Sequence, residues 1–485
     1  MLFKKFEDFG LSHFSYAIGC PKAGKMVVID PSRRIEDYLS YATKHSVVIS
    51  DILDTHIHAD YASGSLELQN ATGATLWQSG YDEGETFQVH FPHRDIYQGD
   101  SIQIGAIRIQ ARHTPGHTPE HLSFVVYDGN RSEQRPMMML SGDFLFVGSI
   151  GRPDLLGEDA KTELAFKLYE SLNNLTDLPG SLEIYPAHGS GSMCGADISG
   201  RPLSTLGYER ATNPYLSFAL NSAKSAQEFV DLVLDNVPPF PEYYKRMKKI
   251  NAQGPDLLGQ SPDIPAIKAP EFKKLSQSGY IIVDLRDGVS FGQGHIRQSF
   301  GIGQKPSLAT WASWFVPYDT PLLLINETTD DIEQAFYSLA SVGLDKVAGY
   351  LEGGIAAWNE DGFELEQSEF TSVSDLHTSL QSSHTAVIDI RTDAEWESGH
   401  ITGAVHIPIH QIENSLHLLP EEPFYVVCGS GYRSTVATSL LLRANQTNHI
   451  NVIGGMSAWL NAGLPTTRQH QAAHGHSLLV DPIGS

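Results

Sequence analysis

Cysteine is scarce in this chain: its 485 residues include only Cys20, Cys194 and Cys428. No two of them form a Cys-x-x-Cys pair. The count therefore argues against a disulfide framework and against a zinc site built from cysteine pairs. Each thiol has to be interpreted separately, and a reducing cytoplasm is the expected location.

Long apolar runs and positive charge are also in short supply. No stretch approaches the roughly 18 apolar residues of a transmembrane helix, and the N-terminus lacks the apolar segment of a secretory signal. With 33 Lys and Arg against 57 Asp and Glu, the formal net charge is −24. This argues against nucleic acid or an anionic membrane as the main partner. A site for an anionic substrate would have to supply positive charge locally.

The length and the apolar pattern predict several α/β domains. A chain of 485 residues is too long for one hydrophobic core. Up to residue 250, strand-like and helix-like segments alternate, and residues 102–111 have the pattern of one half-buried strand. Between residues 251 and 270, four prolines and two glycines indicate a linker.

Beyond that linker the chain repeats itself. The segment Leu-Glu-Gly-Gly-Ile-Ala-Ala-Trp at 351–358 returns as Val-Ile-Gly-Gly-Met-Ser-Ala-Trp at 452–459. An offset of one domain length favours a duplicated α/β domain over a solenoid. We expect five parts: an N-terminal domain at 1–250, a linker at 251–270, a first copy at 271–366, a second copy at 372–468 and a tail at 469–485.

Potential metal ligands follow the predicted strands of the N-terminal domain. The apolar run 47–49 leads to His56, His58 and Asp60 on alternate positions, so an extended chain aims all three to one side. Strand ends are where α/β proteins collect functional loops. Three more candidate ligands follow other predicted strands: His117, Asp143 and His188.

Together, His56-x-His58-x-Asp60, Thr-Pro-Gly-His117, Gly-Asp143 and Pro-Ala-His188 resemble the metallo-β-lactamase superfamily. The resemblance implies an αββα sandwich with a metal at one edge. In the two-metal hydrolases of this superfamily a histidine follows the motif aspartate, whereas this chain has Tyr61. Because a phenol must first lose a proton of pKa ~10, we expect a second metal site to be weak or absent.

The resemblance narrows to the persulfide dioxygenase branch. It implies one Fe(II) per chain, held by His56, His117 and Asp143, a donor set that also matches the facial triad of non-haem iron oxygenases. His58, Asp60 and His188 would then orient these ligands or contact the substrate.

Arg152 and Cys194 each allow a functional and a structural interpretation. Arg152 could hold an anionic group of the substrate, or it could form a structural ion pair with Asp154. Cys194 could meet the persulfide, or it could be a small buried filler, as free cysteines often are. Cys20 has no charged neighbour in the sequence and is expected to be structural.

The second copy carries a cysteine loop. An apolar strand ends at Cys428, and a glycine-rich loop leads into a predicted helix whose N-terminal amides would face the sulfur. With Arg433, this field would favour a thiolate or persulfide. The motif resembles a rhodanese, which implies a persulfide-binding loop of Gly429, Ser430, Gly431, Tyr432 and Ser434. In the first copy the aligned nucleophile position holds Asn326, so we expect that copy to be inactive.

These observations predict an α/β multidomain enzyme, an αββα sandwich followed by two rhodanese-like domains. It would oxidise low-molecular-weight persulfides with O2 to sulfite and thiol, and pass sulfane sulfur through Cys428 to form thiosulfate. We expect a homo-oligomer, a dimer or tetramer, with no nucleic acid or membrane partner. The alternatives are a binuclear zinc thioester hydrolase of the glyoxalase II kind fused to a sulfurtransferase, and a non-enzymatic sulfur carrier or sensor.

Overall fold

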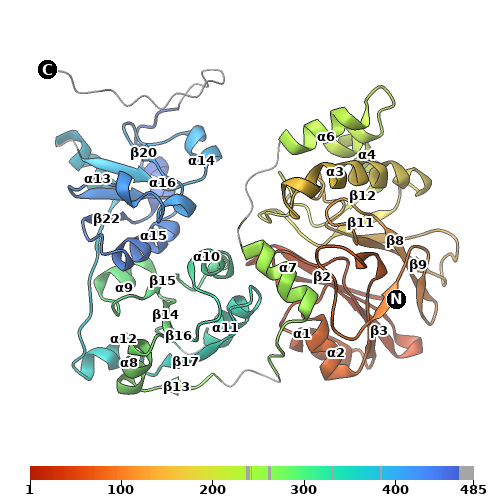
Figure 1. The fold of residues 1–485 in the computed structure, drawn as a ribbon, viewed down its shortest axis with the longest axis horizontal. Helices are drawn as coiled ribbons and strands as arrows, with labels where there is room; N and C mark the ends of the chain where they lie inside the picture. Colours follow the sequence, from red (N-terminus) through yellow and green to blue (C-terminus); the bar gives the residue numbers. More distant parts are fainter. Residues whose placement is uncertain (236–240, 242, 260–263, 329–330, 383–384, 469–485) are drawn as a thin grey trace.

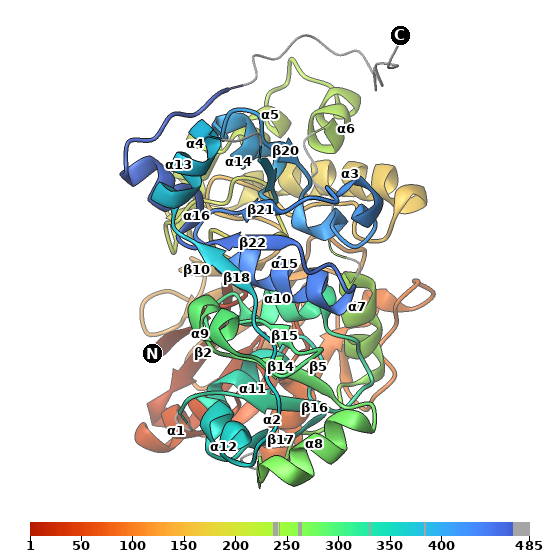
Figure 2. The ribbon, with the colours of Figure 1, turned by 90° about the vertical axis from the view of Figure 1, so that its left-hand side faces the viewer.

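The computed structural model describes residues 1–235, 241, 243–259, 264–328, 331–382 and 385–468. Figure 1 shows an N-terminal domain beside two smaller domains, and Figure 2 confirms that the second small domain is stacked on the first. The expected tail at 469–485 lies outside the described residues. Among the described helices, none combines the length and the apolar character that a membrane span needs.

Two six-stranded sheets form the centre of the N-terminal domain. The first contains β1 (Leu2–Asp8), β2 (His13–Cys20), β3 (Lys25–Ile29), β4 (Val48–Leu53), β5 (Thr75–Ser79) and β6 (Arg94–Ile96). The second contains β7 (Ser101–Ile104), β8 (Ile107–His113), β9 (Leu122–Asp128), β10 (Met138–Gly142), β11 (Glu183–Pro186) and β12 (Ser204–Thr205). Apolar side chains of both sheets, among them Ile29 and Phe124, interleave in one buried core.

Helices cover the outer face of each sheet. On the first sheet lie α1 (Glu36–Lys44) and α2 (Ser65–Thr72). On the second lie α3 (Glu158–Asn173), α4 (Leu206–Thr212), α5 (Pro214–Ala219) and α6 (Ala226–Asp235). Burial of these apolar helix faces contributes roughly 25 cal/mol per Å². The predicted αββα sandwich is therefore confirmed (Figure 1).

One strand prediction was wrong. Residues 102–111 form two antiparallel strands, β7 and β8, rather than one. Gly105 turns the chain between them with a φ of 59°, a conformation that glycine adopts without a Cβ penalty. The apolar positions shift from even numbers in β7 (Ile102, Ile104) to odd numbers in β8 (Ile107, Ile109), and the prediction of one strand did not take this shift into account.

The two repeat domains have the same topology. Their five-stranded parallel sheets have the orders β13-β17-β16-β14-β15 and β18-β22-β21-β19-β20. The first repeat domain contains β13 (Ala266–Ile267), α8 (Ala269–Gln277), β14 (Ile281–Asp284), α9 (Gly288–Gln293), β15 (Phe300–Gly301), α10 (Leu308–Phe315), β16 (Leu322–Ile325), α11 (Ile332–Ala340), β17 (Val347–Leu351) and α12 (Gly354–Glu360). The second contains β18 (Glu369–Thr371), α13 (Val373–Ser382), β19 (Ala386–Asp389), α14 (Asp393–Ser398), β20 (Val405–His406), β21 (Phe424–Val427), α15 (Tyr432–Arg443), β22 (His449–Val452) and α16 (Gly455–Asn461).

A buried ion pair accounts for the repeated Asp-x-Arg sequence. Arg286 donates to Asp284 at 2.6 Å and to the carbonyl of Gly294 at 2.7 Å. Arg391 makes the equivalent bonds, to Asp389 and to the carbonyl of Gly399. Charge-assisted bonds at a strand end of this kind hold the following loop, so this motif has a structural role in both copies.

The end of the expected linker belongs to the first repeat domain. Strand β13 lies inside the range 251–270 and pairs in parallel with β17. Helix α8 then begins at Ala269 with Pro270 in its first turn, where a missing N–H costs no helical hydrogen bond. At least one of the four prolines in this range, Pro270, therefore lies at the start of a helix and not in a linker.

Helix α7 (Tyr243–Gln253) joins the N-terminal domain to the first repeat domain (Figure 1). Arg246 on this helix forms a 2.6 Å ion pair with Asp319. Met247 shares a hydrophobic core with residues around α11. The backbone N–H of Ala62, in the loop after β4, donates to the carbonyl of Ser341 at 2.7 Å.

Candidate metal centre and cysteine loop

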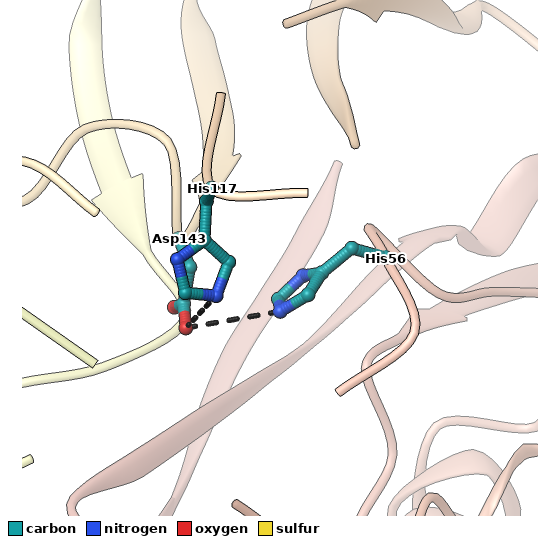
Figure 3. Close-up of side chains that lie close together, drawn as sticks. All are labelled: His56, His117 and Asp143. Carbon is teal, nitrogen blue, oxygen red and sulfur yellow. Dashed lines mark ion pairs between the residues drawn. The ribbon is translucent and has the colours of Figure 1, made fainter. Parts of the chain in front are cut away.

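Three buried side chains converge where strands of the two sheets end (Figure 3). His56 follows β4, His117 follows β8 and Asp143 follows β10. Oδ2 of Asp143 lies 3.8 Å from Nε2 of His56 and 3.5 Å from Nε2 of His117. Two ligand atoms that are each about 2.1 Å from one ion are about 3 to 4 Å apart, so one metal ion fits these three atoms.

The same three atoms lack hydrogen-bond partners among the described residues. Leaving a buried polar atom without a partner costs on the order of 1–3 kcal/mol, and a bound metal would remove that cost. Burial holds the pKa of His56 well below its usual range and lowers the pKa of His117 to about 4. Both imidazoles are therefore neutral, as a metal ligand must be.

Hydrogen bonds from the far side of each ring set its orientation. Nδ1 of His117 lies 2.9 Å from the carbonyl oxygen of Arg152, which only accepts, so the proton is on Nδ1 and the Nε2 lone pair is free. Nδ1 of His56 lies 2.9 Å from the hydroxyl of Thr55, which in turn bonds the Asp30 carboxylate at 3.0 Å. Such outer contacts fix the ligand geometry before a metal binds.

Asp143 is held on both sides. Nδ1 of His188 lies 2.6 Å from Oδ1 of Asp143, and the backbone N–H of Asp143 donates to Nε2 of His121 at 3.0 Å. Burial would raise the pKa of Asp143, but the charge and hydrogen bond of His188 outweigh burial and keep that pKa below its usual range. One carboxylate oxygen thus contacts His188, and the other faces the two imidazoles.

A second group of possible ligands lies next to the first. Ligand atoms of Asp60, His188 and Cys194 all lie within 4.8 Å of one another. Burial raises the pKa of the Cys194 thiol well above its usual range, so the thiol stays neutral. Tyr61 is also kept protonated by burial, and its hydroxyl donates to the carbonyl of Asp30 at 3.2 Å. A protonated phenol engaged in this way is not available as a metal ligand.

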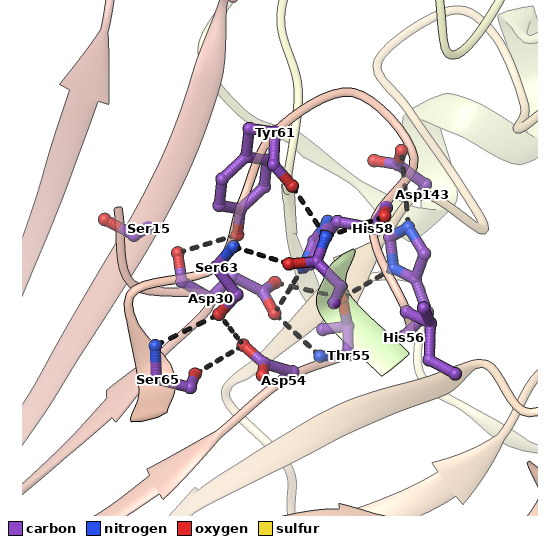
Figure 4. A network of polar contacts seen from close by, with 12 residues as sticks. Ser15, Asp30, Asp54, Thr55, His56, His58, Tyr61, Ser63, Ser65 and Asp143 are labelled. Atoms are coloured by element: carbon purple, nitrogen blue, oxygen red, sulfur yellow. Dashed lines mark hydrogen bonds and ion pairs between the residues drawn. The ribbon is translucent and has the colours of Figure 1, made fainter. Parts of the chain in front are cut away.

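His58 turns to a different set of carboxylates (Figure 4). Its Nε2 lies 3.2 Å from Oδ1 of Asp30. Burial would lower the pKa of His58, but Asp30 and Asp54 raise it above the usual value. Asp54 itself accepts hydrogen bonds from Ser63 and Ser65 at 3.0 and 2.7 Å. His58 is therefore placed to support the loop that carries His56.

Arg152 forms the ion pair with Asp154 that the structural interpretation predicted. Its Nε and Nη2 each donate to Asp154 at 2.8 Å, and Nη1 donates to the carbonyl of Met193 at 3.1 Å. The residue is only 4% exposed. A substrate-binding role for Arg152 stays a prediction, while its carbonyl clearly orients His117.

Helix α7 supplies two contacts that sequence reasoning missed. Nζ of the buried Lys248 donates to the carbonyl of Ile57 at 2.9 Å, and the backbone N–H of Ile57 donates to Glu120 at 2.9 Å. Nδ2 of Asn251 donates to the carbonyls of His58 and Tyr61 at 2.8 and 2.7 Å. About 190 residues separate α7 from this loop, so no local pattern connects them.

Replacing Asn251 by alanine should weaken metal binding. The change removes the hydrogen bonds to the loop after β4 and leaves two carbonyls without their donor. We expect the affinity for the metal ion to fall by about 10–100-fold, the usual effect of losing a supporting contact. The metal retained per chain after dialysis against a chelator measures this change. Gln253→Ala on the exposed side of the same helix is the control, and equal retention in both variants would contradict the prediction.

The cysteine loop surrounds a buried sulfur. Cys428 follows β21, and the N–H of Gly431 donates to its Sγ at 3.1 Å. Oγ of Ser434 lies 3.6 Å from the same sulfur. Gly431 has a φ of 94°, which suits a residue without a Cβ, and α15 begins at the next residue. The loop therefore places an amide and a hydroxyl group beside the sulfur.

Arg433 faces a carboxylate that sequence reasoning also missed. It makes two hydrogen bonds to Glu395 on α14, at 2.7 and 2.6 Å. Burial would raise the pKa of Glu395, but the contact with Arg433 lowers it to about 2. Arg433 is thus tied to α14 beside the cysteine loop, and its action on the Cys428 sulfur stays a prediction.

The first repeat domain has lost this machinery at three positions together. Asn326 follows β16 where Cys428 follows β21. In the aligned sequences Asp331 replaces Arg433, and Ser290 replaces Glu395. Because both members of the ion pair are replaced, the loss involves more than the nucleophile. Its inactivity stays a prediction that a sulfurtransferase assay can test.

Comparisons with known proteins agree with the division into one N-terminal domain and two repeat domains. A model of the metallo-beta-lactamase superfamily matches residues 9–188, and a model of the rhodanese-like domain matches 268–361 and 372–462. Human mitochondrial persulfide dioxygenase ETHE1 is 30% identical over 237 residues, covering 47% of this chain and 79% of that protein. A hydroxyacylglutathione hydrolase of Hyphomonas neptunium is 29% identical over 177 residues, covering 36% of this chain and 62% of that protein.

A solved structure extends the likeness beyond the N-terminal domain. It is described as a metallo-beta-lactamase from Staphylococcus aureus subsp. aureus COL, is 34% identical, and superposes with a TM-score of 0.65. The match covers 72% of this chain and 99% of that one. The chain therefore belongs to the metallo-β-lactamase superfamily, in its persulfide dioxygenase family, with two rhodanese-like domains in the architecture of a persulfide dioxygenase–rhodanese fusion.

Proposed function

We propose that this chain oxidises a low-molecular-weight persulfide with O2, giving sulfite and a thiol, at one Fe(II) held by His56, His117 and Asp143. The convergence of three buried ligand atoms, which have no hydrogen-bond partner in the described part of the chain, carries this proposal. Two neutral imidazoles and one carboxylate are the donor set typical of non-haem Fe(II) oxygenases. The likeness to the human persulfide dioxygenase supports the substrate class.

The protein's part in this reaction is geometric and electrostatic. Iron, when bound, supplies the O2 chemistry that no side chain offers. The Arg152 carbonyl and Thr55 hold the two imidazoles, and His188 holds Asp143. All three ligand side chains are almost completely buried, so the site excludes bulk water and protects a reactive persulfide from side reactions.

We further propose that Cys428 transfers sulfane sulfur to sulfite. The Cys428 thiolate bonds to the outer sulfur of a persulfide, and the carrier leaves as a thiol. The sulfur of sulfite then bonds to that outer sulfur, the bond to Cys428 breaks, and its electron pair returns to the cysteine. Thiosulfate leaves, and no oxidant is consumed. The Gly431 amide stabilises the sulfur anion at each stage.

A two-zinc thioester hydrolase is the second candidate. The likeness to hydroxyacylglutathione hydrolases favours it, as does the group of Asp60, His188 and Cys194 beside the first site. Against it stands Tyr61, at the position where the two-metal hydrolases of the superfamily have a histidine ligand. The neutral, buried Cys194 would have to lose its proton before it could bind a metal.

Metal analysis combined with O2 uptake distinguishes the two candidates. We expect purified protein reconstituted with Fe(II) to hold about one iron per chain and to consume O2 with at least one of the persulfides of glutathione, coenzyme A or cysteine. The same samples should not hydrolyse a glutathione thioester. About two zinc ions per chain with thioester hydrolysis and no O2 uptake would establish the alternative.

Three broader expectations stay predictions. They are the domain limits near residues 250, 270 and 370, the cytoplasmic location, and assembly into a homo-oligomer. A persulfide, O2, sulfite and thiosulfate remain the proposed small-molecule partners, without nucleic acid or membrane.

A further inference from the structure

A cavity of about 750 Å³ lies at the mouth of the cysteine loop. All three domains line it. Arg433 comes from the second rhodanese-like domain, Lys305 and Thr310 come from the first, and Ser12 and Gly191 come from the N-terminal domain. The first rhodanese-like domain and the N-terminal domain thus both contribute walls to the space beside Ser430, Gly431 and Arg433 of the cysteine loop.

The turn between β1 and β2 seats the N-terminal domain in this cavity. The carbonyl of Gly10 accepts a hydrogen bond from Thr310 at 3.4 Å. A Cβ at Gly10 would lie 2.6 Å from the carbonyl oxygen of Pro306, closer than real Cβ contacts. The turn therefore approaches the first rhodanese-like domain at a distance that only glycine permits.

The same turn continues into the surroundings of the metal centre. Oγ of Ser12 donates to the carbonyl of Ser190 at 2.9 Å, and the next residue is His13. The His13 ring lies 4.0 Å from the Tyr61 ring and 5.4 Å from the His188 ring, measured between centroids. His188 in turn bonds Asp143. The turn and the loop after His188 thus extend from the wall of the cavity to residues that contact the candidate metal centre.

Lys305 differs from the other charged side chains that line the cavity. Four charged residues line it, and the fold already engages three of them: Arg286, Arg433 and Asp287. Arg286 and Arg433 are ion-paired, and Asp287 caps α9 through the N–H of Val289 at 2.8 Å. Lys305 is exposed, and it forms no ion pair with any residue that the structure describes. In a chain of net charge −24, such a cation favours a small anion at this place.

We propose that this three-domain cavity binds the sulfur oxyanion that reacts at Cys428, sulfite on entry and thiosulfate on exit, and that sulfite made at the metal centre enters it past the β1–β2 turn. The second part rests on the proposed function. The transfer itself is the balanced exchange described above: sulfite bonds to the outer sulfur, and the electron pair of the broken S–S bond stays on Cys428. The dioxygenase domain thereby forms part of the sulfurtransferase site.

A negative charge placed at Ser12, where the N-terminal domain lines the cavity, tests whether the cavity binds the sulfur oxyanion. Ser12 has a φ of 55°, a conformation that Asn and Asp adopt more readily than other side chains, so Ser12→Asp and Ser12→Asn form a matched pair. Thiosulfate:cyanide sulfurtransferase activity is measured on the full chain. We expect Ser12→Asp to raise KM for thiosulfate at least about fivefold over Ser12→Asn, with similar kcat. Lys305→Glu should show the same excess over Lys305→Gln. Equal KM values within both pairs would overturn the proposal.

An isotope experiment tests the delivery of sulfite. The iron-loaded full chain receives unlabelled persulfide and O2 together with added ³⁴S-sulfite. We expect the oxidised sulfur of thiosulfate to carry less label than the bulk sulfite, because sulfite made at the metal centre reacts first. Equal labelling would show that sulfite mixes with solvent and would overturn the delivery. If persulfide and O2 yield neither sulfite nor thiosulfate, the proposed function fails, while the KM comparison still decides whether the cavity binds the anion.

Discussion

Cys428→Ser should abolish thiosulfate formation while sulfite formation continues. A serine hydroxyl fits the same space, but it cannot form a persulfide and is a far weaker nucleophile at neutral pH. We expect thiosulfate production from persulfide and O2 to fall by on the order of 10³-fold or more. Sulfite should accumulate in its place, because the candidate metal ligands lie in another domain. Chromatographic separation of the two products measures both changes in one sample.

Cys20→Ser is the matched control for this change. Cys20 is buried in the core between the two sheets of the N-terminal domain, away from both candidate sites. The variant should retain both products, at a stability cost of about 1 kcal/mol for burying a hydroxyl. If Cys428→Ser lost sulfite formation as well, the two reactions would be obligatorily coupled, and the division of labour between the domains would be wrong.

His117→Ala should remove the metal and with it the O2 uptake. His117 contributes one of three convergent ligand atoms, and its loss leaves Asp143 and His56 with too few donors to hold iron. Loss of an outer supporting contact costs about 10–100-fold in affinity, so loss of a ligand should cost on the order of 10³-fold or more. Iron per chain and persulfide-dependent O2 uptake are the measurements.

The sulfurtransferase activity of the same sample shows whether His117→Ala has folded. Cys428 lies in a separate domain, and its loop contacts are independent of the metal ligands. Thiosulfate:cyanide turnover should therefore stay near the unmodified level. An iron content and O2 uptake equal to those of the unmodified chain would mean that His117 is not a ligand.

Local patterns in the sequence predicted much of the fold and the identity of the central residues. Apolar runs marked β4 and β10, and the polar residues that follow them were correctly expected near strand ends. His56, His117 and Asp143 converge because buried strands of the two sheets end at one edge. The repeated segments at 351–358 and 452–459 correspond to the same strand-to-helix connection in both copies, β17 to α12 and β22 to α16.

Other features had a weak local signal or none. At Gly105 the apolar alternation only shifts from even to odd positions, and this small change of phase is the signal that separates β7 from β8. For Arg152 the sequence allows two interpretations, because one sequence does not show whether a neighbouring carboxylate faces it. Glu395 could have been suspected only by noticing that the first repeat lacks both members of its pair with Arg433.

The metal centre also depends on residues that no spacing rule connects. Lys248 and Asn251 approach the loop after β4 from a helix about 190 residues away, and Asp30 reaches His56 through Thr55. Periodicity reports the backbone conformation and the buried face of one element, which are local properties. The packing of the domains decides which side chains of distant elements meet. The supporting contacts and the three-domain cavity therefore follow from the tertiary structure and not from any local pattern.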